Sequence, residues 1–283
     1  MGSSFVCQRF ARALFALSRG LYTTDDVRER TRRYWDARDE FQSEAHVLSG
    51  LFDWEKPVFD RHLAPNGRVG IIGCGAGRDV LALSHAGQQV VGLDSSPECV
   101  ALARSFIARS GCVAEVHCAD AADFRFPEPS YDTFVFSWFT YCCIVGSHRR
   151  IQILNRLRQQ LRTPGKVIIS LPYYRTREDK ASQTNTDYAP PKAHEVPQLA
   201  FRFPSNSAQH VTDLTIRFSR NRSPLGADDS ILTLTNDARG GVVSHLHWFS
   251  SEELCDEVRA AGFTITDSLG LEPVVVVLES TIG

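Results

Sequence analysis

Short apolar runs alternate with helix-like segments through the middle of the chain. In the helix-like segments the apolar residues recur at the spacing of one helix face. This order is typical of a parallel sheet that helices cover on both faces. The predicted strands are residues 68–72, 89–94, 112–120, 131–139 and 165–171, and the predicted helices are residues 77–87, 97–110 and 147–162. We therefore expect an α/β fold.

A long amphipathic helix is predicted ahead of the sheet, over residues 24–50. Thr24 can cap it, Gly50 can end it, and its apolar positions keep helical spacing. Residues 1–22 hold three arginines and no acid. That bias occurs in transit peptides and in amphipathic lid helices, and we favour a lid. Residues 1–55 are therefore expected to form an N-terminal helical lid.

The alternation breaks after Leu171 and resumes near His247. The polar insert between them, residues 172–246, contains stretches at 211–220 and 231–237 that resemble antiparallel strands around a turn. A helix at 250–263 and strands at 264–270 and 272–280 complete the main domain, which comprises residues 56–171 and 247–283.

The insert leaves the predicted sheet at the carboxyl end of a strand, where α/β folds bind their ligands. We expect it to cap a site there and to supply substrate contacts. Its proline-rich arm, residues 188–204, is also a candidate homodimer contact.

Composition and charge narrow the function classes. The net charge of −2 gives no field that would favour nucleic acid or an anionic membrane. No apolar run approaches the roughly 20 residues of a membrane span. The eight cysteines contain no C-x-x-C pair, which favours free thiols in a reducing, cytoplasmic setting.

Three glycines follow the first predicted strand, in the stretch "VGIIGCGAGRDVLAL" at residues 69–83. Gly73, Gly75 and Gly77 have the spacing G-x-G-x-G, and Arg78 stands where a dinucleotide fingerprint needs its third glycine. No G-K-[ST] follows, so a Walker phosphate loop is excluded. The glycines allow either close approach of a ligand or simple strand–helix packing.

Two acids end the next two predicted strands. Asp94 lies 17 residues after Gly77, where a carboxylate can accept both hydroxyls of a ribose. Asp120, in "CADAADF", could accept a hydrogen bond from the exocyclic amine of a purine. The alternatives are a solvated turn for Asp94 and a strand-closing residue for Asp120.

Together, these motifs resemble the class I S-adenosylmethionine-dependent methyltransferases. The resemblance covers about residues 68–171 and resumes at 247, with "VVGLDSSPECVALAR", "YDTFVFSWFTY" and "HWFSSEELCDEVRAAGF" as further matches. It implies a Rossmann-like sheet of seven strands, the last antiparallel, and S-adenosylmethionine as cofactor. The cofactor-binding residues that it implies, with two neighbours that we add (Cys74 and Ser95), are Gly73, Cys74, Gly75, Gly77, Asp94, Ser95, Asp120, Ala121 and Ser137.

One position departs from the family pattern. Two residues before its first glycine the family has Asp or Glu, and here that residue is Ile71. The cofactor ammonium then needs another acceptor. A backbone carbonyl near Gly73, a side chain from the lid and Asp79 are the alternatives.

Methyl transfer also needs an aligned acceptor and, for a hydroxyl, a nearby base. Our candidates for catalysis are His245, His247 and Tyr141, and Tyr34 is the candidate lid residue over the cofactor. Trp138, Tyr173 and Tyr174 would form an aromatic mouth for the substrate.

The expected reaction is methylation of an oxygen or nitrogen of a small molecule, in natural-product biosynthesis. A nucleic acid substrate is disfavoured, because "SWFT" replaces the [DNS]-P-P-[YFW] motif of amino-purine methylation. The alternatives are a catalytically inactive cofactor-binding scaffold and a nicotinamide oxidoreductase.

Overall fold

The computed structural model describes residues 23–127, 130–172, 229–233, 243–270 and 273–281. Residues 173–174, the arm at 188–204 and the predicted strand at 211–220 lie outside this part of the chain.

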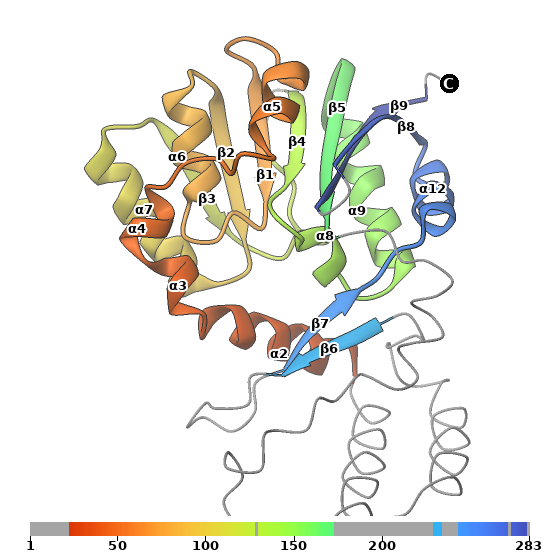
Figure 1. Ribbon diagram of the computed structural model, residues 1–283, viewed down its shortest axis with the longest axis horizontal. Coiled ribbons are helices and arrows are strands. Elements are labelled where there is room, and N and C mark those ends of the chain that lie inside the picture. Colours follow the sequence, from red (N-terminus) through yellow and green to blue (C-terminus); the bar gives the residue numbers. More distant parts are fainter. Residues whose placement is uncertain (1–22, 128–129, 173–228, 234–242, 271–272, 282–283) are drawn as a thin grey trace, which may run out of the picture.

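A seven-stranded sheet forms the centre of the molecule, in the order β3-β2-β1-β4-β5-β9-β8 (Figure 1). Its strands are β1 (Arg68–Ile72), β2 (Gln89–Asp94), β3 (Ala114–Cys118), β4 (Tyr131–Phe136), β5 (Leu161–Leu171), β8 (Phe263–Leu269) and β9 (Val274–Ser280). The first five are parallel, and β9 runs antiparallel to both β5 and β8. The predicted Rossmann-like sheet with an antiparallel last strand is confirmed.

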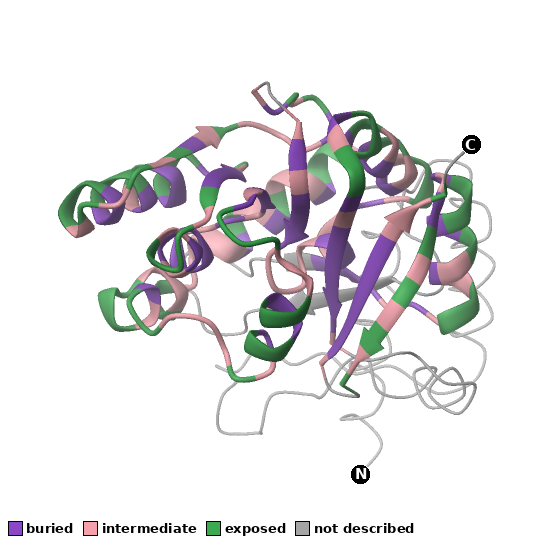
Figure 2. Cartoon of the chain, turned by 90° about the horizontal axis from the view of Figure 1, so that it is seen from above, coloured by how far each residue is buried: buried purple, intermediate pink, exposed green. Residues whose placement is uncertain are grey.

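Helices bury both faces of the sheet, because successive strand residues point to opposite sides. Ile71 and Val135 belong to the cluster beneath one group of helices, whereas Ile72 and Phe136 belong to the cluster beneath the other. The first group is α5 (Lys56–His62), α6 (Arg78–His85) and α7 (Pro97–Ser110), and the second is α9 (Ser147–Gln160) and α12 (Ser251–Ala260). The inner strands are accordingly buried along most of their length, whereas the edge strands β3 and β8 are more exposed (Figure 2).

The N-terminal segment departs from the predicted single helix. It forms α2 (Thr24–Asp36), α3 (Asp39–Gln42) and α4 (Glu44–Val47), and Thr23, not Thr24, caps α2 in a reciprocal capping box with Asp26. The chain turns at Arg38 and again at Ser43, whose extended backbone and side chain cap α4. Serine favours such a cap over a helix interior, so the segment bends around the carboxyl edge of the sheet instead of leaving it (Figure 1).

A two-stranded antiparallel sheet lies at the same edge. It pairs β6 (Asp229–Thr233) with β7 (Val243–His247). β6 overlaps the predicted strand at 231–237, and its partner β7 lies at the end of the insert. The backbone N–H of His245 donates to Thr31 Oγ1 on α2, 3.0 Å away. β7 and α2 therefore close this edge together (Figure 1). Within the described part of the chain, none of the helices has the length and apolar character of a membrane span.

Candidate functional site

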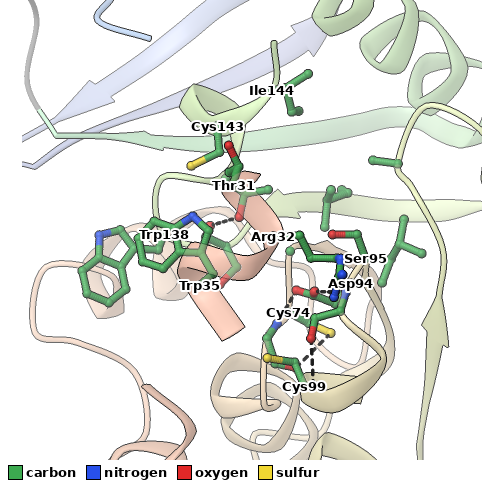
Figure 3. A pocket seen from close by; sticks show the side chains of 18 of the residues that line it. Thr31, Arg32, Trp35, Cys74, Asp94, Ser95, Cys99, Trp138, Cys143 and Ile144 are labelled. Atoms are coloured by element: carbon green, nitrogen blue, oxygen red, sulfur yellow. Dashed lines mark hydrogen bonds between the residues drawn. The ribbon is translucent and has the colours of Figure 1, made fainter. Parts of the chain in front are cut away.

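A cavity of about 260 Å³ opens at the carboxyl ends of β1, β2 and β4, beneath the lid helices. Figure 3 shows the side chains of its wall, with Arg32 beside Asp94 and Ser95, and Trp35 beside Trp138. Nine of the residues predicted from the sequence line it: Gly73, Cys74, Gly75, Asp94, Ser95, Asp120, Ala121, Ser137 and Trp138. The structure thus gathers most of the predicted cofactor set around one space.

The glycine turn crosses the end of β1. The N–H groups of Gly73 and Cys74 both donate to Leu93 O, at 2.7 and 3.0 Å, and a Cβ on Gly73 would collide with the Thr140 side chain. A Cβ on Gly75 would meet no atom within 4 Å, so this glycine leaves open space toward the cavity. Gly77 does not line the cavity.

Gly77 instead lies at the start of α6, where its lack of a side chain allows α6 and α7 to approach closely. Its φ is +96°, and an added Cβ would lie 3.1 Å from the Ala103 Cβ on α7. Among the three glycines, only Gly73 and Gly75 therefore adjoin the cavity.

Asp94 anchors the turn through both of its oxygens. Oδ2 accepts from the Gly75 N–H at 2.8 Å, and Oδ1 accepts from the Ser96 N–H at 2.9 Å. Burial raises the pKa of this carboxyl, and the negative charge of Asp36 raises it further, against the lowering effect of the N–H donors. A carboxylate in this setting gains from a ligand that donates hydrogen bonds or brings positive charge.

Asp36, at the end of α2, is a wall residue that the sequence did not reveal. Its side chain is 11% exposed, and Oδ2 pairs with Arg32 Nη1 at 2.7 Å. Oδ1 is buried and has no hydrogen-bond partner among the described residues. An unpaired buried carboxylate oxygen is costly, so Asp36 is suited to a donor group of a ligand.

Asp120 is bound by two arginines. Oδ1 accepts from Arg149 at 2.5 Å and from the Ala122 N–H at 2.8 Å, and Oδ2 pairs with Arg28 of the lid. Burial raises the pKa of the Asp120 carboxyl, but the hydrogen bonds and the Arg149 charge outweigh it, so that the net shift is downward. The carboxylate therefore stays ionised and ties α2 to the end of β3.

A buried ion network lies under the cavity. Arg78 forms bonds of 2.6 and 2.7 Å to the Glu55 carboxylate and an ion pair of 2.5 Å to Asp79, and its guanidinium lies over the Phe52 ring. Asp79 accepts a hydrogen bond of 2.6 Å from Ser137 Oγ. Asp79, one of the acceptors that the sequence offered for the cofactor ammonium, does not line the cavity. Its carboxylate is instead bound within this network.

The aromatic wall is centred on Trp138. Its φ of +45° is in the left-handed region, which costs a bulky residue roughly 1–3 kcal/mol. The indole packs at centroid distances of 4.7 Å from Phe41 and 5.6 Å from Phe52. The strained backbone therefore directs the indole toward the lid and into the cavity wall.

The predicted catalytic residues do not line this cavity. Tyr141 is fully buried and its hydroxyl donates to Glu257 Oε2 at 3.1 Å. His247 pairs with Glu253 at 2.9 Å, and His245 is 1% exposed with Nδ1 3.4 Å from Cys143 O. Their environments are those of core residues, because alternate residues of β7 face inward rather than into the site.

Tyr34, the predicted lid residue, is also absent from the cavity wall. Its side chain is buried, and its hydroxyl accepts from Arg38 at 3.3 Å. The neighbouring Trp35 and Asp36 occupy the wall instead, since they lie on another face of α2.

His46 is a second wall residue that the sequence did not reveal. It is half-buried on α4, with its ring 5.3 Å from Phe41 and 6.0 Å from Phe52. It lies on the segment predicted as one long helix, which gave no reason to expect its side chain at the sheet edge.

The sequence and the fold both match known methyltransferases. Residues 70–165 match a family model described as a methyltransferase domain. No curated protein sequence matches the chain.

Solved structures share the fold at low sequence identity. An S-adenosylmethionine-dependent methyltransferase of Clostridium acetobutylicum has a TM-score of 0.61 and 12% identity, over 88% of this chain and 99% of that one. An S-adenosylmethionine-dependent methyltransferase of Methanosarcina mazei has a TM-score of 0.58 and 17% identity, over 83% of this chain and 100% of that one. A third is the 1,6-didemethyltoxoflavin-N1-methyltransferase of Burkholderia thailandensis, solved with bound 1,6-didemethyltoxoflavin and S-adenosylhomocysteine. It has a TM-score of 0.55 and 18% identity, over 93% of this chain and 92% of that one.

The sheet order and the glycine turn with its following acid are those of the fold that S-adenosylmethionine-dependent methyltransferases share. Residues 70–165 match the methyltransferase domain model, and together with the shared fold this indicates methyl transfer with S-adenosylmethionine as the cofactor.

Proposed function

We propose that the protein methylates an oxygen or nitrogen of a small molecule, in natural-product biosynthesis. The main support is the cavity itself, in which the Gly75–Asp94 turn and the unpaired Asp36 oxygen adjoin an aromatic wall. The methyltransferase of B. thailandensis, similar in fold, was solved with a small heterocycle bound. The free thiols of the described cysteines agree with the cytoplasmic setting that we propose.

The wall residues fit S-adenosylmethionine, which when bound supplies a methyl group on a cationic sulfur. Asp94 would accept the ribose hydroxyls, and the open space at Gly75 would let the ligand approach the backbone. Asp36 Oδ1 would accept a hydrogen bond from an N–H or O–H of the cofactor. Among the described residues this buried oxygen has no donor. Burial and the charge of Asp36 raise the pKa of Asp94, so hydrogen bonds donated by the ligand would stabilise the Asp94 carboxylate. In this proposal a lid side chain takes the place of the acid that is absent at Ile71.

Replacing Asp36 by alanine is expected to weaken S-adenosylhomocysteine binding by about tenfold or more, the loss of one hydrogen bond to a charged group. The unfolding temperature without ligand should hardly change, because Oδ1 has no partner to lose and Arg32 keeps Glu29. Calorimetric titration and thermal melts test both points, with Asp39→Ala, an exposed acid of the lid, as the control. Equal affinity of the two variants would contradict the role of Asp36.

The proposed activity is tested with labelled S-adenosylmethionine and a set of phenols, amines and nitrogen heterocycles. We expect S-adenosylhomocysteine to bind and at least one acceptor class to become labelled. An inactive scaffold, which the apolar Ile71 favours, predicts binding without transfer to any acceptor. Failure to bind S-adenosylhomocysteine would overturn the proposal at the level of the cofactor site.

We also propose that the insert, residues 172–246, forms a cap that supplies substrate contacts, including Tyr173 and Tyr174. Supporting this, β7 at its end lies against the lid helix α2 at the cavity edge. A homodimer contact through the arm at 188–204 remains part of the proposal, which cross-linking of the full chain can test.

A further inference from the structure

His46 presents an uncommitted imidazole to the cavity. Its backbone N–H donates to Ser43 Oγ and its carbonyl accepts from Ser49 Oγ. For the ring itself, only aromatic contacts are found within the described part of the chain, to Phe41 and Phe52. Because His46 lines the cavity, its imidazole can bond a ligand there.

Two aromatic rings connect His46 to Trp138, in the loop after β4. Phe41 and Phe52 each contact the His46 ring on one side and the Trp138 indole on the other. We call these four residues the aromatic compartment. Trp138 follows Ser137, whose backbone N–H donates to Ile72 O at the start of the glycine turn. The aromatic compartment therefore adjoins the turn that we assign to the cofactor.

The charges around His46 favour its neutral form. Burial lowers the pKa of the imidazole below the ordinary 6.5, and the positive charge of Arg78 lowers it further, while Asp79 and Glu40 act in the opposite direction. Near neutral pH the ring is thus unprotonated and has a free lone pair. A neutral imidazole in a cavity can accept a proton as a general base.

Other histidines near the site are committed elsewhere. His247 pairs with Glu253, and its ring packs on Phe249. His245 is buried behind the cavity, with its Nδ1 near Cys143 O. Neither lines the cavity, so the geometry singles out His46 among the candidates for a base.

We propose that His46 is a catalytic residue and that the acceptor is a planar aromatic molecule with a weakly acidic hydroxyl, a phenol. This inference rests on the proposed methyl transfer and names its acceptor class. Phe41 and Trp138 both line the cavity, and their rings would pack against a planar acceptor. The phenol oxygen forms a bond to the methyl carbon, and the carbon–sulfur bond breaks with its electron pair left on sulfur. The phenol proton passes to the free ring nitrogen of His46 and then to water.

The test compares two phenols of different acidity, 4-methylphenol and 4-nitrophenol, in the natural protein and in His46→Gln. Loss of a general base typically costs 10²-fold or more. We expect such a loss with 4-methylphenol, and little change with the more acidic 4-nitrophenol, which ionises without help. The control is His85→Gln, an exposed histidine at the end of α6, which should behave as the natural protein does.

The pH profile gives a second readout. With 4-methylphenol the rate should rise with pH through the pKa of His46, below 6.5, and level off near neutral pH. In His46→Gln the rise should move toward the ionisation of the phenol itself, near pH 10. Added imidazole should restore part of the rate in His46→Ala, because a small base can enter the space left by the ring.

The results separate this inference from the proposed function. Equal losses with both phenols, or an unchanged profile in His46→Gln, would overturn the role of His46 as a base. No transfer to either phenol by a protein that binds S-adenosylhomocysteine would overturn the acceptor class and leave the cofactor site standing. No binding of S-adenosylhomocysteine would overturn the proposed function itself.

Discussion

Replacing Asp94 by alanine is expected to raise the dissociation constant for S-adenosylhomocysteine by about 100-fold. Two charge-assisted hydrogen bonds to ribose hydroxyls would be lost, at a cost of roughly 1.5 kcal/mol or more each. The variant would also release the N–H groups of Gly75 and Ser96, which Asp94 now accepts at 2.8 and 2.9 Å. The turn would then lose its fixed position as well as its ligand contact.

Calorimetric titration measures this effect, with Asp123→Ala as the control. Asp123 is an exposed acid just after Asp120, so its replacement changes the net charge equally without touching the turn. The Asp94→Asn variant separates charge from shape, because its amide keeps one acceptor oxygen and should lose less affinity than alanine. Equal binding by the natural protein and Asp94→Ala would remove Asp94 from the cofactor site.

The individual strands and the glycine turn were predictable from local sequence, whereas the seven-stranded sheet with an antiparallel last strand came from the family resemblance. Strands such as 68–72 and 89–94 are continuous apolar runs, which are typical of strands buried on both faces. Asp94 ends β2 beside Gly75 in a parallel sheet, so its place at the carboxyl edge followed from topology alone.

Asp36 was missed because no local pattern shows which face of α2 meets the cavity, and His46 was missed because bends in the chain bring it there. The chain turns at Arg38 and Ser43, so α4 presents His46 to a wall that a straight helix would leave. The two arginines on Asp120 come from residues 92 and 29 positions away, Arg28 and Arg149. No local pattern announces such partners.

The predictions for Tyr141, His245 and His247 rested on residue type and on the alternation along a strand. Alternation gives two residues the same face, but it does not say whether that face meets the ligand or the core. In the structure the hydroxyl of Tyr141 is turned to Glu257, inside the cluster that includes Phe249. For Tyr141, the choice between core and site depended on its hydrogen bond to Glu257, a residue 116 positions away in sequence.

Glu257 also forms a buried ion pair with Arg150. Replacing Glu257 by alanine is therefore expected to lower the free energy of unfolding by about 3–5 kcal/mol. The Arg150 guanidinium is 1% exposed and bonds the Glu257 carboxylate at 2.9 and 2.5 Å, so it links α9 to α12. Without Glu257 the buried Arg150 guanidinium would lose both of its bonds to that carboxylate, and Tyr141 would lose the acceptor of its hydroxyl.

Urea denaturation measures the loss, with Asp256→Ala as the matched control. Asp256 pairs with Arg259 on the same helix, but both side chains are more than 70% exposed, so its replacement should cost less than about 1 kcal/mol. The double variant Glu257→Leu with Arg150→Met removes both charges and should recover most of the stability, because packed apolar residues replace buried ion pairs at little cost. A Glu257→Ala loss no larger than that of Asp256→Ala would show that the buried pair does not stabilise the contact between α9 and α12.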